Sequence, residues 1–139
     1  MKLLILTVGI ATTLSWSITT LAQAQTDFGK EEFESKCASC HGQDGKGGGP
    51  LSHAFITKPA DLTVLMKNNG GVFPAQRVYE VIDGRKDVEA HGPRAMPVWG
   101  REFRAKTPDI EGYYDLRSSV AQAKILALID YLYRLQDIK

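Results

Sequence analysis

The chain has 139 residues, of which 43% are hydrophobic and 24% are charged, with 17 basic and 16 acidic side chains. This length favours a single domain, and the composition argues against disorder, a collagen-like repeat or a protein that crosses a membrane many times. The near balance of charge, without a basic stripe, argues against nucleic-acid binding.

The N-terminal residues have the pattern of an export signal. A basic start at Lys2 is followed by an apolar stretch that runs to Leu21, and Ala22-Gln23-Ala24 is a small-x-small cleavage site. This pattern is typical of a secretory signal peptide, so we expect a leader at 1–24 and a mature, soluble domain at 25–139 in the periplasm. The alternative is an uncleaved N-terminal anchor, because the stretch is just long enough to span a bilayer.

The first half of the mature chain predicts helices joined by loops. Asp27 is a candidate N-cap for a helix from about Phe28 to Cys37. Residues 42–50 are rich in glycine and predict a loop. This loop is not a phosphate-binding P-loop, because Lys46 is followed by Gly47 rather than by Ser or Thr.

The second half predicts two short helices and one long one. We expect a helical turn over 61–67, capped by Asp61, and a helix over 74–82 that stops at Asp83-Gly84. A loop is then expected from 85 to about 112. The last helix should run from residue 118 or 119 to 136, because its apolar residues form a broad stripe at helical spacing. We find no sustained alternation that would predict a strand.

Two cysteines and a histidine form the strongest motif, Cys37-Ala38-Ser39-Cys40-His41. Thiols three residues apart can each add to one of two neighbouring vinyl groups of a porphyrin, and the histidine that follows can reach its iron. This spacing is typical of covalent attachment of a c-type haem. The alternatives are a zinc site, a thioredoxin-like redox pair and a structural disulfide.

A second axial ligand for the iron is expected from a methionine. Met96 lies in Ala95-Met96-Pro97-Val98-Trp99-Gly100, where proline and glycine hold the backbone outside regular helix, whereas Met66 lies in an apolar turn typical of core filling. His91 and His53 are the rival ligands. Coordination by His41 and Met96 would favour ferrous iron and raise the reduction potential. Such a centre has no vacant position for substrate, so it transfers electrons.

With these motifs in order, the chain from about Asp27 to Gln136 resembles the class I c-type cytochromes of the bacterial periplasm. The resemblance implies an all-α fold in which three to four helices enclose one covalently bound haem and the N- and C-terminal helices cross. It also implies that Gly29 lets the last helix approach closely, near Leu128 and Tyr131, with Phe33 and Cys37 further along the same first helix.

The resemblance further implies contacts around the haem. Pro59 is the candidate whose carbonyl accepts a hydrogen bond from the axial histidine, although it could be a simple loop proline. Trp99 is a candidate to pack on the haem or bind a propionate. The candidate propionate or docking charges are Arg85, Arg94, Arg101 and Arg104. Residues 101–117 form a longer connection than the smallest family members have.

These features predict a protein that passes single electrons between redox partners such as a dehydrogenase, an oxidase or a reductase, rather than an enzyme. The alternative within the same chemistry is the haem c subunit of a periplasmic oxidoreductase complex. A haem enzyme or gas sensor with a labile sixth ligand, and a cytochrome tethered by its leader, are the other hypotheses.

Overall fold

The computed structural model describes residues 26–85, 96–113 and 115–137. Within these ranges the chain forms helices and loops and no strand, which confirms the expected all-α class. The expected leader, His91 and Arg94 lie outside the described residues. No described helix is both long enough and apolar enough to pass through a bilayer.

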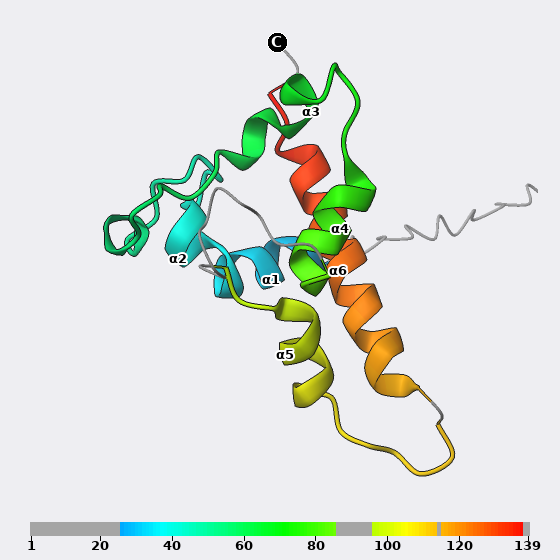
Figure 1. The fold of residues 1–139 in the computed structure, drawn as a ribbon. Helices are drawn as coiled ribbons and strands as arrows, with labels where there is room; N and C mark the ends of the chain where they lie inside the picture. The colour runs from blue at the N-terminus through cyan, green and yellow to red at the C-terminus, as the bar shows by residue number, and fades with distance from the viewer. Residues whose placement is uncertain (1–25, 86–95, 114, 138–139) are drawn as a thin grey trace, which may run out of the picture.

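Four helices have eight residues or more in the described ranges, and α6 is the longest (Figure 1). The helices are α1 (Phe28–Lys36), α2 (Ala38–His41), α3 (Leu65–Asn68), α4 (Ala75–Asp83), α5 (Trp99–Lys106) and α6 (Leu116–Arg134). Short 3-10 turns cover Ser52–Ala54 and Leu62–Val64. Helices α1, α4 and α5 all pack against α6, so the last helix is the element on which the fold is assembled.

Local signals account for most helix boundaries. The Asp27 side chain accepts a hydrogen bond from the Lys30 amide at 3.1 Å and so caps α1 as predicted. Asp61 accepts one from the Thr63 amide at 2.8 Å and caps the turn that leads into α3. Helix α4 ends at Asp83 before a left-handed Gly84. Helix α6 begins at Leu116, two residues earlier than predicted, and ends at Arg134.

The prediction of an unbroken loop from 85 to 112 is wrong, because α5 lies within it. This helix has only eight residues, too few to show a clear apolar period and too few to be stable alone. Its Trp99 and Phe103, four residues apart, share one face, and their rings stack with centroids 6.1 Å apart. Phe103 is 2% exposed, so the helix is stabilised by burying this face against α6.

Helices α1 and α6 meet at Gly29 as predicted, and the residues nearest to this glycine are the expected Tyr131 and, in place of the expected Leu128, its neighbour Ala127. A side chain at Gly29 would overlap the Ala127 carbonyl oxygen and touch Cβ of Tyr131, so only glycine allows this approach. Phe33 is completely buried, and its ring centroid lies 5.2 Å from that of Tyr131. The core that begins at this crossing continues through Ile125 and Leu128, which are 0% and 1% exposed.

Candidate functional site

The attachment motif lies where α1 gives way to α2. Cys37 ends α1, and its carbonyl accepts hydrogen bonds from the amides of Cys40 (3.1 Å) and His41 (2.9 Å), which start the next helical turn. This turn brings both thiols and the imidazole to one side of the chain. No disulfide joins Cys37 and Cys40. Burial, and then the nearby Glu32 carboxylate, raise the pKa of the Cys37 thiol to about 12.

The glycine-rich loop holds this turn in place through its backbone. The amides of Gly47, Gly49 and Leu51 donate to the carbonyls of His41, Cys40 and Ser39 at 2.7, 3.1 and 2.8 Å, in that order. A Cβ atom on Gly49 would lie 2.5 Å from the carbonyl oxygens of both Ala38 and Ser39. The predicted loop therefore packs closely against the backbone of the attachment motif and stabilises it by hydrogen bonds.

The His41 ring is oriented by a backbone carbonyl, but not by the predicted one. Its Nδ1 lies 2.9 Å from the carbonyl oxygen of Ala60, not of Pro59. Because a carbonyl can only accept, Nδ1 holds the proton and Nε2 is the nitrogen that can bind a metal. The Pro59 carbonyl instead faces the backbone of Gly47.

Two cavities meet at this motif. The main cavity has a volume of about 320 Å³ and is enclosed largely by apolar side chains from α1, α4 and α6, with Ala60 from the loop. The smaller cavity, of about 30 Å³, lies towards Phe55, Pro59 and Trp99. The residues that line both cavities are Cys37, His41 and Met96, and Cys40 lines the smaller one.

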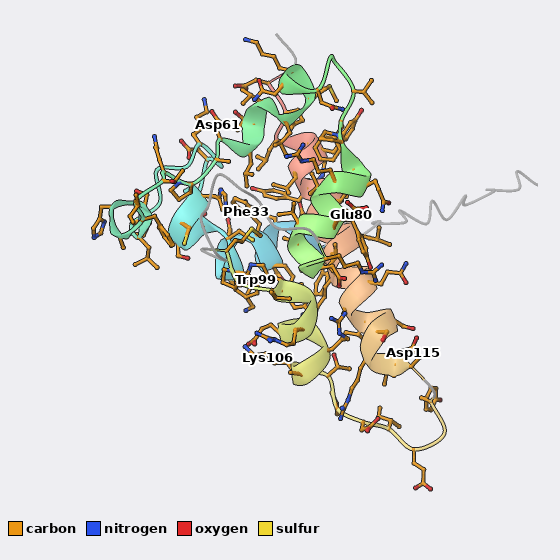
Figure 2. All side chains as sticks on the ribbon, viewed as in Figure 1. Phe33, Asp61, Glu80, Trp99, Lys106 and Asp115 are labelled. Atoms are coloured by element: carbon orange, nitrogen blue, oxygen red, sulfur yellow. The ribbon has the colours of Figure 1, made fainter. Side chains whose placement is uncertain are left out.

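The structure therefore brings together all four residues predicted to hold the haem. Met96 is half-buried just before α5 and lines the same two cavities as His41, so an imidazole and a thioether border a common space. The rival Met66 lies in α3 and lines neither cavity, and His53 is exposed in the 3-10 turn. Trp99 lines the smaller cavity, and Figure 2 shows it at the end of α5 that lies nearest α1.

Two of the predicted haem-edge arginines have another partner. Arg85 Nε lies 2.6 Å from Oδ2 of Asp83, and Arg104 Nη1 lies 3.1 Å from Oδ1 of the same carboxylate, which is 5% exposed. These two arginines neutralise a buried charge that joins α4 to α5. Arg101 is exposed.

Sequence reasoning missed Arg77, which lines the main cavity together with Asn68 and Asn69. It also missed most of the apolar wall that α4 contributes, Val78, Val81 and Ile82. The signal that could have found them is the spacing on α4: these positions and Arg77 fall within two turns, so one face of the helix is directed at the cavity.

The donor set fits a c-type haem. The thiols, the imidazole and the thioether all border one cavity system, and the wall behind them, which includes Leu128 and Leu132, is apolar enough to hold a porphyrin ring. The four residues predicted to hold the haem and the helices α1 to α5 all fall within residues 24–110. This region matches the family model for cytochrome c oxidase, cbb3-type, subunit III.

No curated protein and no solved structure matches the chain at a significant level. The family match alone covers more than half of the sequence and contains the attachment motif in its expected order. The chain therefore belongs to the family of cytochrome c oxidase, cbb3-type, subunit III: it is a class I c-type cytochrome, a family that binds haem c covalently.

Proposed function

We propose that this chain transfers single electrons through one haem c, attached at Cys37 and Cys40, with His41 and Met96 as its axial ligands. The observation that carries the proposal is that Cys37, His41 and Met96 line both cavities, so a thiol, an imidazole and a thioether border one space. When bound, the haem supplies an iron that alternates between the ferric and ferrous states.

The protein's own residues prepare the site for this role. The Ala60 carbonyl fixes the tautomer and plane of His41, so Nε2 is presented for coordination without a search among rotamers. Met96 supplies a soft, neutral thioether that favours the ferrous state and raises the potential. If His41 and Met96 both held the iron, no position would remain for oxygen or another substrate, which favours an electron carrier over an enzyme.

The apolar wall and the rim have separate tasks. Buried side chains such as Phe33, Leu128 and Leu132 exclude water, so little solvent rearranges when the charge of the centre changes. The smaller cavity reaches the surface side of the motif at Phe55 and Trp99, both half-buried. We place electron exchange at this rim, where a partner can dock through a small and transient interface.

We further propose that the protein works in the periplasm after removal of residues 1–24. The support is the signal-peptide pattern and the start of the family match at residue 24, where the expected leader ends. The N-terminal residue of the purified protein tests this proposal: a start near Gln25 supports cleavage, and retention of Met1 supports an anchor.

A second candidate is a haem c subunit of an oxidoreductase complex. The family's description as an oxidase subunit favours it and makes an oxidase the first partner to test. Copurification from the native membrane fraction at low salt distinguishes the two: a stable complex supports a subunit, and a monomer that is oxidised by an added oxidase supports a diffusible carrier.

Haem attachment is tested by mass and by absorption. Protein produced with a haem-attachment system should gain the mass of one haem and show a Soret band. A polypeptide of unmodified mass without a Soret band would overturn the proposal.

Met96→Ala tests the second ligand. Loss of the thioether should lower the midpoint potential by on the order of 0.1 V or more, because axial ligands alter haem potentials over a range of about 0.8 V. The variant should also bind carbon monoxide at the vacated position. Met66→Ala is the matched control, because Met66 is half-buried but lines neither cavity. An unchanged potential in Met96→Ala would overturn the axial assignment.

A further inference from the structure

Glu32 is a buried carboxylate on α1 that the haem-binding role does not explain. The residue is 8% exposed, and one of its oxygens forms an ion pair with Nζ of Lys124 on α6. Its other oxygen, Oε2, is buried and has no hydrogen-bond partner in the described part of the chain. A carboxylate left half-satisfied in this way costs free energy, so its presence needs a reason other than stability.

Two aromatic rings lie close to the lysine of this ion pair. The Lys124 ammonium lies 5.3 Å from the ring centroids of both Phe28 and Phe103. Its side chain is 26% exposed and the Glu32 side chain 10%. A charge with little water around it acts over a longer distance than a solvated one.

Neighbouring side chains connect this pair to the two cavities. Phe33, the neighbour of Glu32 on α1, lines the main cavity. Phe103, which contacts Lys124, stacks on Trp99, and Trp99 lines the smaller cavity. Among the charged groups that act on the Cys37 thiol, Glu32 raises its pKa most, so the carboxylate's field reaches an atom that would be bonded to the haem.

The pair has little value as a structural contact. A buried ion pair gains from Coulomb attraction about what it loses in desolvation, and hydrophobic replacements are often as stable. The α1–α6 crossing already has Gly29, Phe33 and Tyr131 to hold it. The negative charge beside the attachment site is what distinguishes this pair from the exposed ion pairs of the same helix.

From these contacts we propose that Glu32 tunes the reduction potential of the haem, by holding a buried negative charge that favours the ferric state. Lys124 limits this effect by partly neutralising the carboxylate. The inference rests on the proposed function, since it concerns a haem bound at Cys37. It adds a residue that controls the direction in which electrons flow between this protein and its partners.

The test compares two glutamates on one helix. Glu32→Gln removes the buried charge, and Glu34→Gln removes an exposed charge that is paired with exposed Lys30 at 3.8 Å. Potentiometric titration of the holoproteins should show a higher midpoint in Glu32→Gln. At the wild-type midpoint, the ferrous-to-ferric ratio should rise at least about threefold, whereas Glu34→Gln should change it by less.

A third variant separates charge from loosened packing. Lys124→Gln should shift the midpoint in the opposite direction, because it leaves the carboxylate without its neutralising partner. Loosened packing would move both variants in the same direction. Opposite shifts, with the larger change at Glu32 than at Glu34, support the proposal, and any other pattern overturns it.

The holoprotein also separates this proposal from the proposed function. If the three variants and the wild type all lack a Soret band, the haem assignment itself has failed. If all four carry covalent haem and Glu32→Gln keeps the wild-type midpoint, only the tuning role of Glu32 is wrong.

Discussion

On the histidine side of the cavity, backbone hydrogen bonds hold His41 in place. On the methionine side, Met96 is positioned by side-chain contacts between distant helices. His41 lies in a turn whose carbonyls accept three hydrogen bonds from the loop of residues 47–51, and the Ala60 carbonyl orients its ring. All of these partners come from within about twenty residues of the motif in sequence.

Met96 has a different kind of support. It lies just before Pro97 and α5, and α5 is positioned by packing against α4 and α6. Gly100 packs closely against Asp83 at the end of α4, and Asp83 forms ion pairs with Arg85 and Arg104. The methionine is therefore placed by the relative position of three helices.

The difference implies that the two ligands can be lost separately. A disturbed histidine side should prevent the attachment motif from forming at all. A disturbed methionine side should leave haem attached and coordinated by His41 but weaken the second bond. Variants on the two sides of the cavity should therefore differ in whether haem is still attached.

Gly49→Ala should have the largest effect. The new methyl group would lie 2.5 Å from two carbonyl oxygens and 2.7 Å from the Cys40 carbonyl carbon. These atoms belong to backbone, so they cannot move aside as a flexible side chain can, and we expect a loss of about 3 kcal/mol or more in unfolding free energy. The yield of covalent holoprotein should fall with it.

Gly48→Ala is the control for this prediction. It adds the same methyl group one residue earlier, where no atom of the described residues, apart from the two chain neighbours, lies within 4 Å. Holoprotein yield and thermal unfolding should match the wild type. If Gly49→Ala and Gly48→Ala had the same holoprotein yield and the same thermal unfolding, the close packing of the loop on the motif would not matter for haem attachment.

Gly100→Ala should have an intermediate effect, confined to the methionine side. A methyl group there would overlap Oδ1 of Asp83. Glycine-to-alanine changes inside a helix normally stabilise it by about 0.5–1 kcal/mol, so a net loss of about 1–3 kcal/mol would come from this overlap.

Haem attachment should survive in Gly100→Ala, while the red absorption band typical of methionine–iron bonding in the ferric protein should weaken. Asp83 is held by two arginines and cannot move without breaking an ion pair. If the band and the unfolding midpoint both stay at their wild-type values, α5 does not position Met96.

Asp27→Asn should have the smallest effect, and it depends on pH. Arg134 binds the Asp27 carboxylate with two hydrogen bonds of 2.7 and 2.9 Å, which with the Lys30 amide lower the pKa of Asp27 from 3.8 to about 2. Its contribution to stability is therefore complete above about pH 4. That contribution is lost as the pH falls through about 2.

Asparagine retains the N-cap but not the charge, so the variant isolates the ion pair. Wild type should be the more stable at neutral pH, and the gap in denaturation midpoints should close between about pH 4 and pH 2. A gap of constant size down to pH 2 would assign the effect to the cap. Because the pair is exposed, added salt should narrow the gap at neutral pH.

The attachment motif and the helices that carry it could be read from the sequence because the signals are local. Cys37, Cys40 and His41 are separated by fixed numbers of residues on one turn, so their relative placement follows from helix geometry. The caps at Asp27 and Asp61 depend on an amide two or three residues away. Gly29 was informative only through the family resemblance, since its contact is with Ala127 and Tyr131.

Tertiary structure decided what depends on contacts between distant segments. The choice of Ala60 over Pro59 depends on how the loop lies on Gly47, and α5 exists because burial of Phe103 on α6 stabilises eight residues that are too few for a stable isolated helix. Glu32 is an acidic residue among others in the sequence. Its burial against Lys124, 92 positions away, appears only when α1 and α6 cross, because a carboxylate's environment is set by what packs around it.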